Sequence, residues 1–239
     1  MMFGNPNKMK KGYGAKMKDV LSTIPVIIFA GGLGTRMQPY SSVLPKPLLL
    51  YNGKTMIENI ISLYVDKGFH DFYIILGHNS ELIKSYLESK SLPCNVVFVS
   101  EREPLGTIGG LKLIENELDN SFIVCNCDNY GDFDYISLIE YFDSSKADIL
   151  IPIRSIVHTI PFGIINCDSN MNVCGINEKP QTKIMISTGI HILKRNVLDL
   201  ISKGERIDMP QLINKASNSY VVKCVDVSSY KWIDMSISE

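Results

Sequence analysis

The chain has 239 residues, and its 24 lysines and arginines nearly balance its 25 aspartates and glutamates, so the formal net charge is −1. This length suits one domain with a large core, and the charge balance argues against a nucleic-acid-binding protein, which usually has a strong basic excess. The six cysteines include no CxxC pair and mostly sit within apolar runs, which favours buried, reduced thiols over disulfides or a metal site.

The start of the chain is rich in lysine, glycine and asparagine and has no apolar periodicity, so we expect a mobile basic tail over residues 1–22. This segment lacks the hydrophobic core of a secretion signal, and no apolar run in the chain is long enough to cross a bilayer. We therefore expect a cytoplasmic protein that binds neither membranes nor nucleic acid.

From residue 23 onward, apolar runs of strand length alternate with segments of helical periodicity. TIPVIIFAGG (23–32) is an apolar run closed by glycines, as expected of a buried parallel strand. In KTMIENIISLYVDKG (54–68), apolar residues recur at intervals of four, and a glycine stands where a helix would stop. By the same criteria we expect further strands at 71–77, 95–100, 121–126 and 147–154, and further helices at 79–89, 108–118 and 135–145.

After residue 154 the segments become shorter. We expect strand-like pieces at 161–168, 172–179, 186–193, 220–227 and 231–235, and short helices at 196–202 and 209–217. Strands that alternate with helices predict an α/β fold with a Rossmann-like mixed, mostly parallel sheet flanked by helices. We expect a single domain over residues 23–239, with a nucleotide half at about 23–154 and a substrate half at about 155–239.

A phosphate-binding loop is suggested by FAGGLGTRMQPYSSVLPKP (29–47), in which three glycines are followed by Thr35, Arg36 and Lys46. Glycine lets the backbone approach a ligand closely, and amides that precede a helix attract phosphate. The stretch contains neither GxxxxGK[ST] nor GxGxxG, and a plain tight turn is the alternative interpretation.

The whole string GGLGTRMQPYSSVLPKPLL resembles GGxGTRLxPxTxxxPKPLxP, a signature of sugar-1-phosphate nucleotidylyltransferases. Further segments resemble motifs of that family in the same order: EREPLGTIGGL, CNCDNY, IPFGI, EKP, STGIHIL, DMPQLI and KWIDMS. The resemblance runs from about residue 25 to the last residues. It implies a GT-A-like fold of the nucleotide-diphospho-sugar transferase type, in which the second half binds the sugar phosphate. It also implies transfer of a nucleotidyl group from an NTP to a sugar 1-phosphate, with release of pyrophosphate.

By this resemblance, Arg36 would clasp the triphosphate and Lys46 would neutralise charge near the α-phosphate, so both would be catalytic. For either cation, a solvated surface charge is the alternative. The remaining nucleotide contacts, largely through backbone amides, would come from Gly31, Gly32, Gly34, Thr35, Leu105 and Gly106.

Asp128 follows an apolar run, and a carboxylate just past the carboxyl end of a buried strand lies where parallel sheets place ligands. The resemblance pairs Asp128 with Asp234 as ligands of a Mg²⁺ cofactor, which favours oxygen ligands. A turn or cap role for Asp128, and a strand-capping role for Asp234, are the alternatives.

The resemblance places the sugar phosphate against Lys179, a catalytic cation, and against Glu178, which would accept sugar hydroxyls. Gly163 and Thr188 would line the sugar pocket, although a plain strand hydroxyl is an alternative for Thr188.

The chain departs from the family pattern at two places. Cys127 replaces a glycine before Asp128, and Met235 and Ser236 replace Ile-Gly after Asp234. These departures leave open a catalytically weak protein that binds nucleotide sugars and regulates.

The segments EPLGTIGG and DMPQLI most resemble guanylyltransferases that act on mannose, heptose or amino-sugar phosphates. We therefore expect GTP as the donor, for surface glycan precursors, while a thymidylyl or uridylyl donor and a homo-oligomer stay open.

Overall fold

The structure is a computed structural model that describes residues 20–32, 37, 43–77 and 80–236. The predicted site residues Gly34, Thr35 and Arg36, and most of the predicted basic tail, lie outside these ranges. None of the helices in the described residues is both long and apolar enough to cross a membrane.

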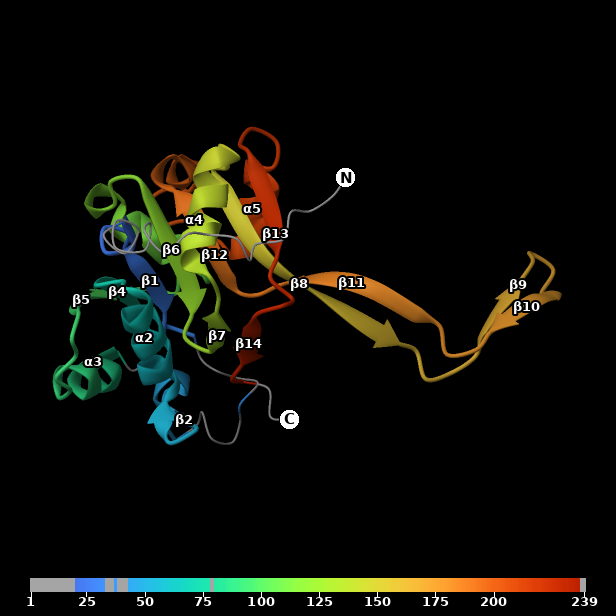
Figure 1. Ribbon diagram of the computed structural model, residues 1–239, viewed down its shortest axis with the longest axis horizontal. Coiled ribbons are helices and arrows are strands. Elements are labelled where there is room, and N and C mark those ends of the chain that lie inside the picture. The colour runs from blue at the N-terminus through green and yellow to red at the C-terminus, as the bar shows by residue number, and fades with distance from the viewer. Residues whose placement is uncertain (1–19, 33–36, 38–42, 78–79, 237–239) are drawn as a thin grey trace, which may run out of the picture.

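The centre of the molecule is an eight-stranded sheet in the order β11-β8-β12-β6-β1-β4-β5, with β13 paired to β8 (Figure 1). The pairs β1–β4, β1–β6, β4–β5 and β13–β8 are parallel, whereas β12 runs antiparallel to β6 and β8. The strands of this sheet are β1 (Val26–Phe29), β4 (Asp71–Leu76), β5 (Asn95–Ser100), β6 (Ser121–Asn126), β8 (Ile149–Thr159), β11 (Gln181–Ser187), β12 (Ile190–Lys194) and β13 (Val222–Asp226). The predicted α/β fold with a mixed, mostly parallel sheet is confirmed.

Helices and short two-stranded sheets surround this centre. The α-helices are α2 (Met56–Lys67), α3 (Ser80–Glu88), α4 (Tyr135–Ser144) and α5 (Met209–Ala216), and the 3₁₀ helices are η3 (Lys46–Leu48), η4 (Gly109–Leu113), η5 (Glu115–Glu117) and η6 (Arg195–Leu200). The two-stranded sheets pair β2 (Leu50–Tyr51) with β3 (Lys54–Thr55), β7 (Asn129–Asp132) with β14 (Lys231–Asp234), and β9 (Ile164–Cys167) with β10 (Val173–Asn177).

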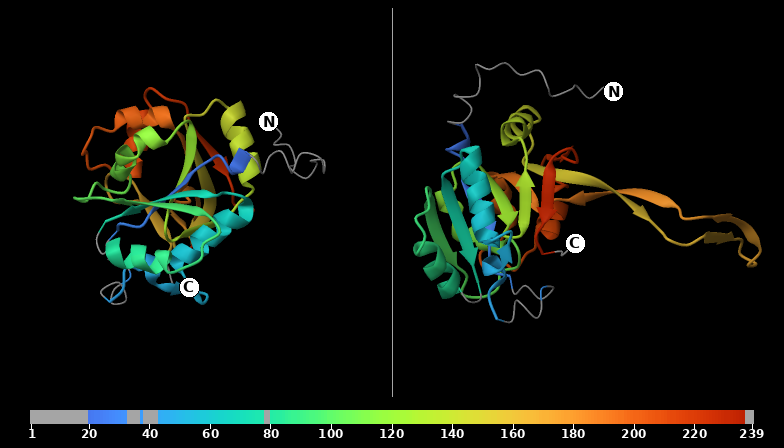
Figure 2. Two further views of the ribbon diagram at one scale, coloured as in Figure 1. Left: turned by 90° about the vertical axis from the view of Figure 1, so that its left-hand side faces the viewer. Right: turned by 60° about the horizontal axis from the view of Figure 1, so that its bottom comes forward.

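Side chains of β1 alternate between two apolar layers, as the pleat of a strand requires. Val26 and Ile28 pack with α2 and α4 on one face, whereas Ile27 packs with η4, η6 and α5 on the other. Figure 2 shows these helices around the sheet. Burial on both faces explains why the predicted strand lacks polar alternation.

The predicted helix at 54–68 is confirmed as α2, and its ends follow from local chemistry. Thr55 caps the amino end in a capping box with Glu58, and Gly68 ends the helix with φ of 106°.

Two predicted helices are present as 3₁₀ helices rather than α-helices. Residues 108–118 form the two 3₁₀ helices η4 and η5, and residues 196–202 are mostly the 3₁₀ helix η6. In the segment 108–118, Gly109 and Gly110 both disfavour an α-helix. A Cβ at Gly110 would also lie 2.6 Å from Glu101 Oε1. Packing against Glu101 therefore determines the conformation of this segment, and the regular helix that its apolar spacing predicts does not form.

Strands β8 and β11 leave the sheet together and form a long arm that carries β9 and β10 at its tip (Figure 1). We call residues 154–187 the arm. The short strand-like pieces predicted at 161–168 and 172–179 correspond to β9 and β10, but sequence reasoning did not anticipate their position away from the body of the protein.

His191 on β12 is a buried histidine with little hydrogen bonding. Its Nε2 lies 3.3 Å from Ser187 Oγ, and its Nδ1 has no hydrogen-bond partner among the described residues. Burial lowers the pKa of His191 from 6.5 to about 4, because it disfavours the charged ring.

This burial predicts a loss of stability in acid. Below pH 6.5 the unfolded chain takes up a proton at His191 and the folded chain does not, so the contribution to stability falls as pH drops from 6.5 to about 4. A shift from 6.5 to about 4 corresponds to about 3 kcal/mol in the free energy of unfolding, at roughly 1.4 kcal/mol per pH unit. Urea unfolding across this pH range should show a flatter profile for His191→Gln than for the wild type. Parallel profiles would contradict the assignment.

Candidate active site

A cleft of about 710 Å³ opens at the carboxyl ends of β1, β4 and β6, a size within the usual range for small-molecule sites. Its wall includes Gly31 after β1, Gly77 after β4, and Asn126 to Asp128 at the end of β6. The other side is formed by residues 101–104, 106 and 107 and by Arg206 and Asp208. Ligands of open α/β sheets bind at this edge.

The predicted glycine contacts Gly31 and Gly32 both line the cleft. A Cβ at Gly31 would lie 2.8 Å from the backbone nitrogen of Gly77, so the loops after β1 and β4 can approach only with glycine there. Gly32 faces open space, since no atom lies within 4 Å of a Cβ built on it. The floor of the cleft is therefore exposed backbone, which suits an anionic ligand.

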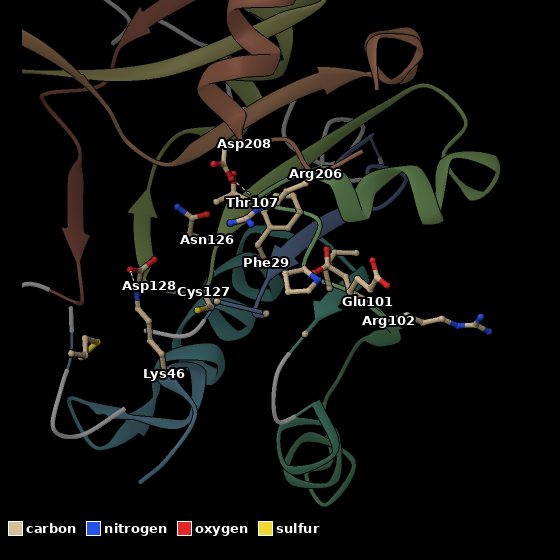
Figure 3. Close-up of a pocket in the computed structure, with 18 residues that line it drawn as sticks. Phe29, Lys46, Glu101, Arg102, Thr107, Asn126, Cys127, Asp128, Arg206 and Asp208 are labelled. Carbon is tan, nitrogen blue, oxygen red and sulfur yellow. Dashed lines mark hydrogen bonds and ion pairs between the residues drawn. The ribbon is translucent and has the colours of Figure 1, made fainter. Parts of the chain in front are cut away.

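Lys46 and Asp128 form an ion pair within the cleft and point toward one another in Figure 3. Lys46 opens η3 between Pro45 and Pro47, and the side chains of Pro47 and Leu48 are buried beneath it. Asp128 is only 3% exposed, and the neighbouring Cys127 thiol is also buried. Burial raises the pKa of Cys127 to about 12, so this thiol stays protonated at neutral pH.

The opposite wall is joined by hydrogen bonds between two distant segments. The Thr107 amide donates to Asp208 Oδ1 at 2.7 Å, and the Met209 amide donates to Thr107 Oγ1 at 3.0 Å. Gly106 has φ of +81°, and a Cβ there would lie 2.4 Å from the Ile207 carbonyl oxygen. This wall therefore requires glycine at position 106.

Leu105, the predicted nucleotide contact next to Gly106, does not line the cleft. Its carbonyl accepts a hydrogen bond from the Ile207 amide at 2.9 Å, so it holds the two segments of the wall together.

Several residues of the cleft were missed by sequence reasoning: Glu101, Arg102, Thr107, Asn126, Arg206 and Asp208. Glu101 is half-buried, and burial raises the pKa of its carboxyl group. The segment DMPQLI was recognised as a motif, but only the fold shows that its Asp208, at the start of α5, meets Thr107.

Asp234 lies beside Asp128 through backbone pairing. Strand β14 places Asp234 opposite Asn129, and the Met235 amide donates to the Asp128 carbonyl at 2.8 Å. The two departures from the family pattern have clear places here. Met235 is buried in the core, and Ser236 donates from its amide and hydroxyl to Asp234 Oδ1 at 2.9 and 2.6 Å.

A bound Mg²⁺ usually has one or two protein carboxylates and completes its coordination with water and substrate phosphates. Asp128 and Asp234 are two such donors on adjacent segments, and Asp128 is the one of the two that lines the cleft, so the chemistry of the donors fits this ion. The described residues contain no group of three or more His, Cys, Asp or Glu that could hold a metal without a substrate.

The predicted sugar-phosphate contacts are not brought to the cleft. Gly163, Glu178 and Lys179 lie on the arm, away from the body (Figure 1). Thr188 is fully buried, and its hydroxyl donates to the Pro152 carbonyl at 2.9 Å.

An open, mostly parallel sheet with a glycine-lined cleft at its carboxyl edge defines an α/β protein with a small-molecule cleft at the usual ligand edge of the sheet. The chain belongs to the family described as "Nucleotidyl transferase", whose model matches residues 25–235. This confirms the resemblance to sugar-1-phosphate nucleotidylyltransferases.

Individual relatives agree with this family. The chain is 30% identical over 223 residues to a mannose-1-phosphate guanyltransferase of Yarrowia lipolytica, in a match that covers 87% of this chain and 60% of that protein. It is 25% identical to a D-glycero-alpha-D-manno-heptose 1-phosphate guanylyltransferase of Campylobacter jejuni, with 89% and 95% covered. The crystal structure of HddC from Yersinia pseudotuberculosis complexed with GMP-PN superposes with a TM-score of 0.68, at 26% identity, and covers 90% of this chain and 94% of that one.

The close contact at Gly106 gives a test of the cleft wall. Gly106→Ala and Gly204→Ala both place alanine at a positive φ, of 81° and 77°, but only Gly106 faces a neighbour, since Gly204 has open space. We expect Gly204→Ala to lower the free energy of unfolding by about 1 kcal/mol, from the left-handed backbone alone. Gly106→Ala should lower it by roughly 1–3 kcal/mol more, from overpacking. Urea unfolding measures both values, and equal losses would contradict the described wall.

Proposed function

We propose that this protein transfers a nucleotidyl group from an NTP to a sugar 1-phosphate, giving an NDP-sugar and pyrophosphate. The observation that carries the proposal is the cleft of a nucleotidyl transferase family member, in which exposed glycine backbone lies next to the Lys46–Asp128 pair. The chain spans 60% of the length of the Y. lipolytica relative. The activity is therefore proposed from the cleft of this chain and not transferred from the whole relative.

In the proposed reaction, a phosphate oxygen of the sugar 1-phosphate attacks the α-phosphorus of the NTP in line. A new P–O bond forms as the bond from the α-phosphorus to the bridging oxygen breaks, and pyrophosphate leaves with that electron pair. The protein's part in such a transfer is positioning and charge neutralisation. The amides of Gly31 and Gly32 would hold the phosphates, and Lys46 would lie against the α-phosphate.

The Lys46 ammonium pairs with Asp128 in the cleft. We infer that phosphate oxygens of a bound substrate would share this ammonium with the Asp128 carboxylate. Asp128 and Asp234 would then hold Mg²⁺, which supplies further neutralisation of the phosphate charge when bound. Arg36 would add a cation to the triphosphate, by the family resemblance.

GTP is the proposed donor, and two findings support it. The relatives from Y. lipolytica and C. jejuni are named as guanyltransferases. The cleft also has carboxylates on the wall opposite Lys46, at Glu101 and Asp208. Guanine presents an N–H and an adjacent amino group as donors on one edge, and a carboxylate accepts both. We propose a cytoplasmic reaction that supplies surface glycan precursors; a thymidylyl or uridylyl donor, and binding without turnover, are the alternatives.

A pyrophosphate-release assay tests the activity directly. Purified protein with Mg²⁺ should release pyrophosphate from GTP and mannose, heptose or amino-sugar 1-phosphates, and more slowly from TTP or UTP. Release with TTP or UTP alone would overturn the GTP assignment. Binding of nucleotide without release from any pair in the panel would favour the binding protein.

The Lys46–Asp128 pair gives a sharper test of the mechanism. Lys46→Ala should lower kcat/KM by roughly 10²–10³, the scale for losing one group that stabilises the transition state. Asp128→Asn should abolish turnover while nucleotide binding stays measurable, and EDTA should stop the wild type until Mg²⁺ is restored.

Lys67→Ala is the matched control, because Lys67 also pairs with an aspartate, Asp132, but lies outside the cleft. Its turnover should stay close to that of the wild type. Near-normal turnover of Lys46→Ala would remove the assigned role.

A further inference from the structure

The arm carries a strained corner at its tip. Lys179 has φ of +47°, a left-handed conformation that is uncommon for a residue other than glycine, and its amide donates to the Phe162 carbonyl at 3.3 Å. Gly163 lies close to the Glu178 side chain, because a Cβ at Gly163 would be 2.8 Å from Glu178 Oε2. Strain of this kind tends to persist at functional positions. The corner therefore holds Glu178 and Lys179 in a fixed arrangement, although both are exposed.

This corner cannot reach the cleft of its own chain. Strands β8 and β11 pair in an unbroken register from Ile153↔Ser187 to Thr159↔Gln181, and the pairing continues as the Ile160 amide donates to the Pro180 carbonyl. Six residue steps at roughly 3.3 Å each place the end of this ladder about 20 Å from the sheet. Folding back would break the ladder.

The arm also exposes apolar side chains along its length. The cross-strand pairs Ile156–Ile184 and Ile165–Ile176 are all exposed, and Phe162 near the corner is 72% exposed. An isolated two-stranded ribbon is at best marginally stable in water, and exposed apolar surface of this extent marks an interaction site. The arm is thus built to pack against protein.

Further positive charge from the arm would suit the cleft, in which carboxylates outnumber cations among the described residues. Among its described lining residues, Lys46, Arg102 and Arg206 face four carboxylates, and Arg102 points away from the other labelled residues in Figure 3. Two phosphorylated substrates would add further negative charge. Lys179, together with Lys183 on the same arm, supplies cations of the required sign.

We propose that two copies of this chain exchange arms, so that Glu178 and Lys179 of one copy complete the cleft of the other. A second copy is the fitting occupant because it has the same cleft and the same arm, so one two-fold exchange satisfies both apolar surfaces and both sites. This inference rests on the proposed function for the role of the completed site. The exchange itself is a statement about assembly.

Mixed dimers test the exchange. We call the rest of the chain, which contains the cleft, the body. Lys46→Ala removes a catalytic group from the body, and Lys179→Ala removes one from the arm. Each variant alone should lose roughly 10²–10³ in kcat/KM. Co-expression with two different tags, followed by tandem purification, yields dimers with one copy of each variant. With exchanged arms, one of the two sites is intact, and the mixed dimer should have about half the wild-type activity. If each arm serves its own body, no site is intact and activity stays at the level of the single variants, which would overturn the proposal.

A mixed dimer of Lys46→Ala with Asp128→Asn is the control, because both changes lie in the body and no site is intact under either arrangement. It should remain inactive. Recovery in this control would show that the assay cannot distinguish arms from bodies, and recovery in both mixtures would therefore count against the exchange.

Sedimentation velocity separates failure of the exchange from failure of the proposed function, because it needs no activity. The wild type should be a dimer at micromolar concentration, and Phe162→Asp should make it a monomer. Tyr141→Asp is the matched control: Tyr141 is an exposed aromatic in the second half of α4, away from the arm, and its variant should stay dimeric. A monomeric wild type, or a dimer unaffected by Phe162→Asp, would overturn the exchange even if the protein is an active transferase.

Discussion

A buried carboxylate organises this molecule. Asp128 is 3% exposed at the end of a central strand, and an ion in such a place requires a partner of opposite charge. Lys46 provides it from η3, and η3 is fixed in turn by buried Pro47 and Leu48 and by the hydrogen bond from the Met56 amide, at the start of α2, to Leu49. The backbone of the same aspartate holds Met235, near the other end of the chain. Through its side chain and its backbone, Asp128 thus ties η3, the start of α2 and the last strand together.

The sequence predicted the first half of the fold well, because its central strands β1, β4 and β6 are largely buried and read as nearly uninterrupted apolar runs. The helix that became α2 was also predictable, since Thr55, Glu58 and Gly68 determine its ends by local contacts. Residues 108–118 were misread because apolar spacing does not show that Gly110 packs against Glu101. The sequence pattern predicts the secondary structure where contacts within the segment determine it. The prediction fails where a residue distant in the sequence determines it.

The candidate site divides in the same way. Gly31, Gly32, Gly106, Lys46 and Asp128 were all named from motifs and all line the cleft, but the ion pair between Lys46 and Asp128 could not be foreseen, because 82 positions separate them. Asp208 was missed because its hydrogen-bond partner, Thr107, lies 101 positions away in the sequence. The arm is the hardest case. Apolar residues at 156, 165 and 176 indicate packing, yet a single sequence does not state whether the surface they contact belongs to the same molecule.

The burial of Cys127 has a practical consequence. A thiol beside the key carboxylate would normally make a cleft vulnerable to electrophiles and oxidants, but reactivity requires the thiolate, and this thiol keeps its proton well above neutral pH. The exposed cysteines are elsewhere, at Cys167 and Cys174 on the tip of the arm and Cys224 on β13. A maleimide dye or spin label applied to the unmodified protein will therefore attach to these exposed thiols and not to Cys127. Labels on Cys167 and Cys174 then report the position of the arm without any engineered cysteine.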